Sequence, residues 1–169
     1  MEKGLPSGGP FFYVGQMTFE IIEDDLAGNE VRALLRFHLD EMYRHSPADS
    51  VHAMPVERLA ARDVTFWSLW SADSLAGCGA LKQIDASHGE LKSMRTAPAF
   101  LRKGVAEAIL LHLMAEAKTR GYRRLSLETG RTAPFAAAHA LYRKHGFAVC
   151  VPFADYTEND FSLCMSRAI

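Results

Sequence analysis

Residues 90–110 read ELKSMRTAPAFLRKGVAEAIL, and this stretch passes from a strand through a tight basic loop into a helix. Glu90–Arg95 has the character of a strand, and the apolar residues after Gly104 recur with helical spacing. Backbone N–H groups at a helix start can bind an anion, and Arg102 and Lys103 add positive charge beside them. We therefore expect a phosphate or diphosphate here, although on spacing alone one glycine before an amphipathic helix also fits an ordinary loop.

The elements around this stretch alternate between strands and helices. Downstream, the helix continues to Gly121, followed by a strand at Arg123–Glu128, a helix at Pro134–His145 and closing strands at 147–151 and 161–165. Upstream, the pattern predicts a strand at Met17–Ile22, a helix at Leu26–Tyr43 capped by Asp24 and Asp25, a helix at Pro55–Arg62, and strands at Asp63–Trp70 and Leu75–Ile84.

The order of these elements predicts the fold class. The last two upstream strands and Glu90–Arg95 form an antiparallel meander. A strand, loop, helix, strand unit over 90–128 implies one parallel strand pair, or a gap between two strands, in an otherwise antiparallel sheet. The predicted class is α/β, with a mixed, mostly antiparallel central sheet flanked by helices.

Composition and charge narrow the class of protein. The chain has 169 residues, of which 49% are apolar and 23% charged, enough for one substantial core. The 19 Lys and Arg residues are balanced by 20 Asp and Glu residues, and the net charge of −1 argues against a nucleic-acid-binding protein. Because no apolar stretch approaches the ~20 residues of a bilayer span, we expect a soluble protein.

The cysteines and the first residues indicate a compartment and a domain boundary. Cys78, Cys150 and Cys164 form no close pair, which fits a reducing cytoplasm and argues against a disulfide framework. They resemble strand core residues rather than covalent nucleophiles. Residues 1–16 are rich in Gly and Pro and lack the features of a signal peptide, so we interpret them as an N-terminal extension, native or vector-derived, ahead of one domain over 17–169.

Three segments together resemble the GNAT superfamily of N-acetyltransferases: residues 90–110, RGYRRLSLE at 120–128 and AHALYRKHGF at 138–147. The resemblance runs from Met17 to the C-terminus and implies a GNAT-like fold, in which two strands splay apart and acetyl-CoA lies in the opening. By resemblance, the cofactor-binding residues are Ser93, Met94, Arg95, Leu101, Arg102, Lys103, Gly104, Val105, Ala106, Ala138 and Tyr142. The chain departs from the family pattern at Leu101, Ala106 and Phe135, where relatives carry glutamine or arginine, glycine, and asparagine.

Tyr142 lies in the family's helix-tyrosine-glycine-phenylalanine pattern, which implies a role as general acid. A phenol near the sulfur of a thioester can donate a proton as thiolate charge develops. The tyrosine also shares a helical stripe with Ala138 and Leu141, so a buried core tyrosine is the alternative. The main chain near Ser93 and Met94 would polarise the thioester carbonyl, because family relatives carry a bulge there.

Acetyl transfer to an amine requires a base, because an amine is mostly protonated at neutral pH. Glu90 occupies the position from which some family members deprotonate the acceptor, directly or through water. Glu128, at the end of the neighbouring strand, is the rival. Both carboxylates could instead be solvated or pair with Lys92 and Arg124.

The acceptor side is expected in the segment His38–Ala53, which covers it in family members. The acceptor-site candidates by placement are His38, Tyr43, Ser46, Ser50 and His52, together with Glu128 and with Tyr156 from the loop at 152–160. The histidines at 38, 45 and 52 recur every seven residues, but neither a cysteine nor an acidic partner completes a ligand set. We therefore expect no metal site.

The sequence thus predicts an N-acetyltransferase that moves the acetyl group of acetyl-CoA directly to a primary amine in a ternary complex. The amine belongs to a small molecule or to a protein, and neither a nucleic acid nor a membrane is an expected partner. The closing strands and exposed aromatic residues such as Trp67 or Trp70 would support a homodimer. The competing hypothesis is a non-catalytic acetyl-CoA-binding sensor or interaction module of the same fold, which the departures at Leu101 and Phe135 leave open.

Overall fold

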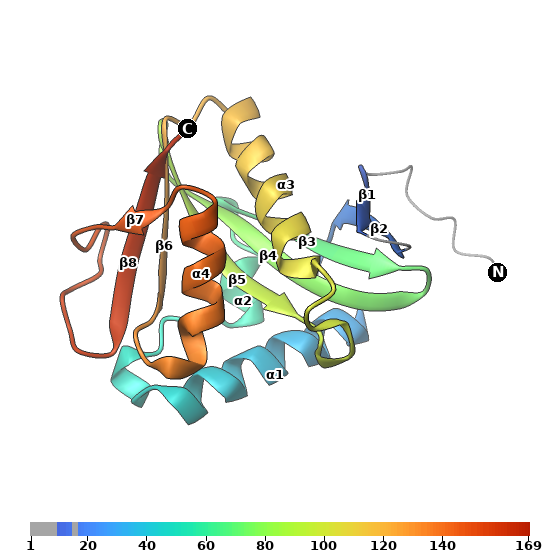
Figure 1. Cartoon of the computed structure of the whole chain (residues 1–169), viewed down its shortest axis with the longest axis horizontal. Helices are drawn as coiled ribbons and strands as arrows, with labels where there is room; N and C mark the ends of the chain where they lie inside the picture. Colours follow the sequence, from blue (N-terminus) through green and yellow to red (C-terminus); the bar gives the residue numbers. More distant parts are fainter. Residues whose placement is uncertain (1–9, 15–16) are drawn as a thin grey trace.

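One sheet with helices on both faces makes up the computed structural model, which describes residues 10–14 and 17–169 (Figure 1). The strands are β1 (Phe11–Val14), β2 (Met17–Glu23), β3 (Val64–Ser71), β4 (Ser74–Asp85), β5 (His88–Thr96), β6 (Arg124–Gly130), β7 (Ala148–Val149) and β8 (Ser162–Ala168). The α-helices are α1 (Asn29–His45), α2 (Val56–Leu59), α3 (Val105–Thr119) and α4 (Ala136–Lys144). Short 3-10 turns lie at η1 (Ala48–Ser50), η2 (Pro98–Phe100) and η3 (Ala133–Phe135).

The sheet is antiparallel except for one pair of neighbours. Its order is β1-β2-β3-β4-β5-β6-β8-β7, and β5 and β6 run parallel. These two strands pair from His88 with Arg124 to Leu91 with Leu127. Beyond that point their pairing ends, and Figure 1 shows them diverging towards the side where α1 lies. The mixed sheet and its splayed parallel pair confirm the predicted fold class.

Each face of the sheet packs against its own helices. On one face, α3 and α4 cover a core that includes Ile109, Leu113 and Leu127. On the other face, α1 and α2 cover a second core that includes Leu35 and Cys78. Side chains alternate between the two faces of the sheet along each strand. Neighbouring residues of β5 or β6 therefore face different pairs of helices, α3 and α4 on one side and α1 and α2 on the other.

The start of α1 differs from the expectation. Asp24 and Asp25 do not cap this helix, which begins at Asn29 with Gly28 at its N-cap and no side-chain cap. The Asp24 carboxylate instead accepts hydrogen bonds from the Leu26 amide at 2.8 Å and the Ser68 hydroxyl at 2.6 Å. The acidic pair thus shapes the turn after β2 and joins it to β3.

Strand β1 lies within the segment interpreted as an extension. It pairs with β2 in antiparallel register, and Phe12 packs against the core under α3. The sequence FFYV at 11–14 has the aromatic and β-branched character that favours such a strand. The domain boundary at Met17 stays a prediction.

The aromatic residues of β3 do not form the exposed surface that was expected. Trp67 is buried, with its ring 5.2 Å from that of His112 in α3. Trp70 is half-buried against the α1 core, and its indole N–H donates to the Ser68 hydroxyl at 2.8 Å. The expectation was wrong because helices cover both faces of β3. In the described part of the chain, no helix is long and apolar enough to cross a membrane.

Candidate active site

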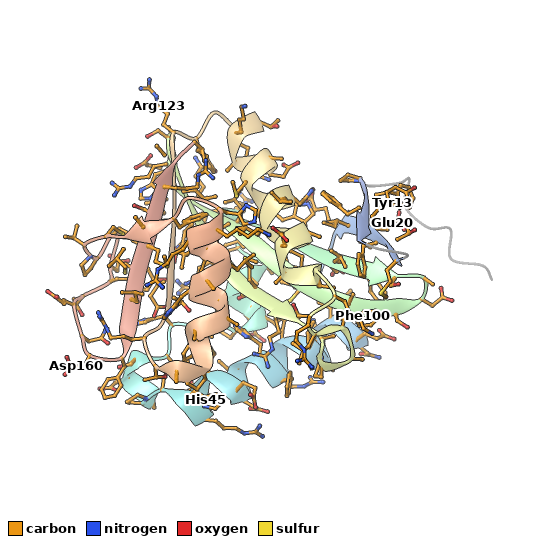
Figure 2. All side chains as sticks on the ribbon, viewed as in Figure 1. Tyr13, Glu20, His45, Phe100, Arg123 and Asp160 are labelled. Atoms are coloured by element: carbon orange, nitrogen blue, oxygen red, sulfur yellow. The ribbon has the colours of Figure 1, made fainter. Side chains whose placement is uncertain are left out.

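A cavity of about 680 Å³ lies where β5 and β6 diverge. Its lining comes from α1, β5, β6 and α4, and from the turn that leads into α3. Two of the lining residues are labelled in Figure 2: His45 at the end of α1, and Phe100 in η2 before α3. Side chains from the helical layers on both faces of the sheet therefore contribute to the cavity wall.

The turn at Gly104 forms one end of this cavity. Gly104 has a φ of 77° and Arg102 a φ of 58°, so the backbone enters α3 through two left-handed residues. Of the loop predicted to hold a diphosphate, Leu101, Arg102, Gly104, Val105 and Ala106 line the cavity. The first N–H groups of α3 have no partner within the helix, so this wall offers hydrogen-bond donors.

Lys103 is the exception in this loop. It does not line the cavity. Its ammonium group donates to the Ala99 carbonyl at 2.9 Å and lies 5.2 Å from the centre of the Phe100 ring. Its side chain thus stabilises η2 rather than contributing to the cavity wall.

A β-bulge interrupts β5 beside the cavity. Cys78 pairs with Arg95 and Ala80 pairs with Lys92, so Ser93 and Met94 together oppose a single residue of β4. Ser93 has a φ of 52°, as the extra residue of a bulge can have. Because of this bulge, Lys92 and Arg95 face the same side of the sheet although they are three residues apart. The bulge lies where the resemblance implied one.

Tyr142 is placed by contacts at both ends of α4. At the start of the helix, the His139 ring bonds the Gly130 carbonyl of β6 at 2.7 Å, and the Phe135 ring packs on Gly130. At the end, Glu107 of α3 accepts a hydrogen bond from His145 at 2.7 Å. The Tyr142 side chain lines the cavity while its residue is only 8% exposed.

The Tyr142 hydroxyl keeps its proton at neutral pH. Burial raises the pKa of this phenol to about 12. The hydroxyl donates to the sulfur of Met94 on β5 at 3.7 Å. A protonated phenol in the cavity wall is the form that a general acid needs.

The two carboxylates proposed as bases lie in different environments. Glu128 lines the cavity, and burial raises its pKa to about 7, an effect that Lys92 opposes and Glu90 strengthens. Glu90 is buried and lines a second, adjoining cavity of about 410 Å³. It accepts hydrogen bonds from Lys92 at 3.2 Å and from the Tyr156 hydroxyl. The pairing of Glu90 with Lys92 is the structural alternative that the sequence left open.

The predicted acceptor residues divide into two groups. His38, His52 and Glu128 line the large cavity, and Tyr156 lines the adjoining one next to Glu90. Burial, followed by the charges of Arg95 and Lys92, lowers the pKa of His38 to about 4, so its ring is neutral at pH 7. Tyr43, Ser46 and Ser50 line neither cavity, with Tyr43 exposed and Ser50 buried in η1.

The Acetyltransferase (GNAT) family matches the chain over residues 18–147, which run from within β2 to beyond the end of α4 and hence include most of the cavity wall. The chain belongs to the GNAT acetyltransferase family. It is 51% identical to the uncharacterized N-acetyltransferase YsnE of Bacillus subtilis (strain 168) over 146 residues, 86% of this chain and 97% of that protein. It is 53% identical to the uncharacterized N-acetyltransferase YedL of Escherichia coli (strain K12) over 151 residues, 89% of this chain and 95% of that protein.

The fold is also that of solved GNAT structures. A GNAT family acetyltransferase from Elizabethkingia anophelis, determined with acetyl-CoA bound, superposes with a TM-score of 0.65. The match covers 89% of this chain and 98% of that chain at 15% identity. As a GNAT acetyltransferase, the protein is an enzyme that transfers an acetyl group to an amine acceptor.

Several residues that line this cavity were not predicted from the sequence. Glu41, Met42 and His45 line the cavity beside His38 because they follow it on one face of α1. Their spacing of three, four and seven residues from His38 is a helical stripe that the sequence itself contains. The polar residues of that stripe, His38, Glu41 and His45, indicated that one face of the predicted helix borders a binding site rather than the apolar core.

Proposed function

We propose that this GNAT enzyme binds acetyl-CoA in the large cavity and transfers the acetyl group directly to a primary amine within one ternary complex. The observation that carries this proposal is the separation of β5 from β6 beyond Leu91 and Leu127, beside the anion-binding turn at Gly104. The acetyl-CoA bound to the Elizabethkingia anophelis enzyme of the same fold supports the choice of donor. Acetyl-CoA would supply a thioester carbonyl carbon for the amine to attack.

The residues present fit such a donor. The N–H groups at the start of α3 and the guanidinium of Arg102 are suited to a diphosphate. Val105, Ala138 and Leu141 give the wall between the turn and β6 an apolar character suited to the pantetheine arm. The departures at Leu101 and Ala106 leave this binding possible, because backbone N–H groups do not depend on the side chain.

Glu128 is the base that the geometry supports best. The acceptor amine is protonated at neutral pH, and a carboxylate that lines the cavity and titrates near pH 7 can take its proton. Glu90, which the resemblance favours, is already bonded to Lys92 and Tyr156 and lies outside the large cavity. We propose that Glu90 acts indirectly, by holding Lys92 and the loop that carries Tyr156.

Two further groups stabilise developing charge. The Tyr142 phenol donates a proton towards the departing thiolate, consistent with its burial and raised pKa. The main chain at the Ser93–Met94 bulge offers N–H groups to the acyl oxygen.

The cysteines support direct transfer over a covalent cysteine intermediate. Burial raises the pKa of the Cys78 thiol to about 12 and that of the Cys164 thiol to about 11, so both thiols stay protonated at neutral pH.

Thiol release from acetyl-CoA with a library of amines tests this function. Initial rates measured while both substrates are varied should give intersecting reciprocal plots, and mass spectrometry should find no acetylated enzyme after incubation with acetyl-CoA alone. Parallel plots with an acetylated enzyme would contradict the ternary complex. Tight binding of acetyl-CoA without thiol release from any amine would support the non-catalytic sensor instead.

A further inference from the structure

Arg95 is a cavity-lining cation that the protein itself leaves poorly paired. Its Nε is buried and has no hydrogen-bond partner among the residues that the structure describes. Its closest carboxylate contact joins Nη2 to Oε2 of Glu41 at 4.0 Å, beyond hydrogen-bond distance. The guanidinium carbon lies 4.6 Å from the centre of the Phe37 ring on α1. The bulge in β5 therefore turns this arginine towards α1 and the acceptor side of the cavity.

Lys92, on the same face of β5, shows the contrast. Its ammonium group donates to Glu90 at 3.2 Å, to the Tyr156 hydroxyl at 2.6 Å and to the His52 carbonyl at 3.3 Å. An ammonium group has three hydrogens to donate, so the protein itself satisfies Lys92. Arg95 differs in that its charge is partly buried without comparable partners.

The surroundings of Arg95 do not neutralise its charge. Burial lowers the pKa of its guanidinium, yet an arginine stays charged at physiological pH. Glu41 is shared, because it also contacts Arg44 and lies 3.6 Å from the His45 ring. His38, the other polar neighbour on α1, is uncharged at pH 7. A half-buried charge with such weak partners destabilises the folded protein unless a bound ligand supplies the missing hydrogen-bond acceptors.

Strand β6, which also borders the cavity, contributes a carboxylate, whereas β5 contributes the guanidinium of Arg95. Glu128 of β6 faces the same side of the sheet as Arg95, since Leu127 beside it points into the α3 and α4 core. The cavity thus carries a carboxylate that can accept a proton on one strand and an unsatisfied guanidinium on the other. This arrangement matches a molecule with an amine at one end and an anion at the other.

We propose that the acceptor is an amine that also carries a carboxylate, as amino acids do, with the carboxylate bound by Arg95 and the amine directed to Glu128. The proposal rests on the proposed function, because it names the acceptor class of the same site. A carboxylate matches the planar fork of a guanidinium in two parallel hydrogen bonds. A dianionic phosphate suits the site less well, because Glu41 stands 4.0 Å from Arg95.

The test is a matched panel of acceptors assayed by thiol release. Each α-, β- and γ-amino acid is compared with its carboxamide and with the amine that lacks the acid group. For at least one spacing, we expect kcat/KM to be roughly 10- to 100-fold higher for the carboxylate than for the carboxamide. Arg95→Gln should remove this preference by lowering kcat/KM for the acid much more than for the carboxamide.

Control variants separate recognition from folding. Arg36→Gln removes an exposed arginine on α1 and should leave the preference intact. Arg95→Lys keeps a charge, so it should keep part of the preference even if Arg95→Gln folds poorly. Thermal melting with and without acetyl-CoA shows that each variant is folded and still binds the donor.

Two outcomes would overturn the proposal while leaving the proposed function intact. One is equal or better turnover of carboxamides and neutral amines at every spacing. The other is an Arg95→Gln variant whose KM rises for acetyl-CoA alone, because Arg95 would then serve the donor. If acetyl-CoA neither binds nor releases its thiol with any amine, the proposed function fails and this inference fails with it.

Discussion

The hydroxyl of Tyr142 donates a hydrogen bond to the sulfur of Met94 at 3.7 Å, across the opening between α4 and β5. A thioether sulfur is a weak acceptor, so this bond is easily exchanged for a stronger one. Burial raises the pKa of the phenol to about 12, which keeps the proton on the oxygen, so that the hydroxyl can donate to negative charge developing on a nearby sulfur. The pair therefore marks where the departing sulfur would lie.

Replacing Tyr142 with phenylalanine tests this assignment. Tyr142→Phe should lower kcat about 10- to 100-fold with KM for acetyl-CoA within about twofold, because the hydroxyl acts in the transition state rather than in donor binding. Steady-state thiol release measures both constants. Tyr122→Phe, which alters a buried tyrosine outside the cavity, is the matched control and should keep kcat. An unchanged kcat in Tyr142→Phe would remove this residue from the mechanism.

The raised pKa of Glu128 predicts a pH dependence. The carboxylate form of the wild-type enzyme accumulates as pH rises through about 7, so kcat/KM should increase across that range. Glu128→Gln should lower kcat/KM and abolish this inflection, leaving only the titration of the amine itself. Rates measured from pH 5.5 to 9 with one amine, for both proteins, give the comparison. An inflection near pH 7 that persists in the variant would exclude Glu128 as the base.

The same shift affects folding stability with a defined sign. The folded state keeps the Glu128 proton over the window from the ordinary value of 4.5 to about 7, whereas the unfolded chain has already lost it. The stability that protonated Glu128 contributes is present below this window and is lost as pH rises through it. Glu128→Gln should therefore raise the Tm relative to wild type more at pH 8 than at pH 4.5. An equal difference at both pH values would indicate that the pKa is not raised.

Glu90→Gln separates the two candidate bases. Glu90 is buried and pairs with the partly buried Lys92, so loss of one charge should cost ~3 kcal/mol of unfolding free energy, measured by urea denaturation at pH 7.5. A pH inflection should survive in this variant at a lower pH, because Glu128 is intact but loses the nearby charge of Glu90 that helps to raise its pKa. If Glu90→Gln loses the inflection and Glu128→Gln keeps it, Glu90 is the base, as the family resemblance implied.

The anion-binding turn predicts unequal roles for two neighbouring cations. Arg102 lines the cavity, whereas Lys103 donates to the Ala99 carbonyl outside it. Arg102→Gln should therefore weaken acetyl-CoA binding roughly 3- to 10-fold, and Lys103→Gln less than about twofold. Isothermal titration calorimetry at low and high salt measures both, and the salt dependence should shrink in Arg102→Gln. Equal losses in the two variants would argue against this orientation of the loop.

The parts of the site that the sequence predicted are local in the chain. The Gly104 turn and the tyrosine of α4 lie within short stretches where a glycine, a helix start and a periodic stripe occur together. Such signals depend on residues a few positions apart. The parallel pair of β5 and β6, one of the two arrangements that the sequence allowed, followed from the helix that crosses between these strands.

What the sequence could not predict depends on long-range contacts. The family resemblance implied a bulge near Ser93 and Met94, but that it turns Arg95 to the same side of the sheet as Lys92 is visible only in the pairing of β5 with β4. Glu90 contacts Tyr156 across 66 residues, and no local pattern connects a strand carboxylate to a loop tyrosine so distant. Asp24 illustrates the same limit, because its bond to Ser68 outweighs the capping preference of aspartate.

The close approach of α3 to β4 gives a prediction for stability. A Cβ atom on Gly77 would lie 2.8 Å from the Arg95 carbonyl and 2.7 Å from Val105, so Gly77→Ala should cost ~1–3 kcal/mol of unfolding free energy, measured by urea denaturation. Because Val105 begins the helix that follows the Gly104 turn, its displacement should also raise KM for acetyl-CoA. Gly121→Ala is the control: its φ of 76° costs about 1 kcal/mol in open space, far from the cavity, and should leave that KM unchanged. A Gly77→Ala enzyme with wild-type stability and KM would mean that α3 does not pack as closely on β4 as the structure indicates.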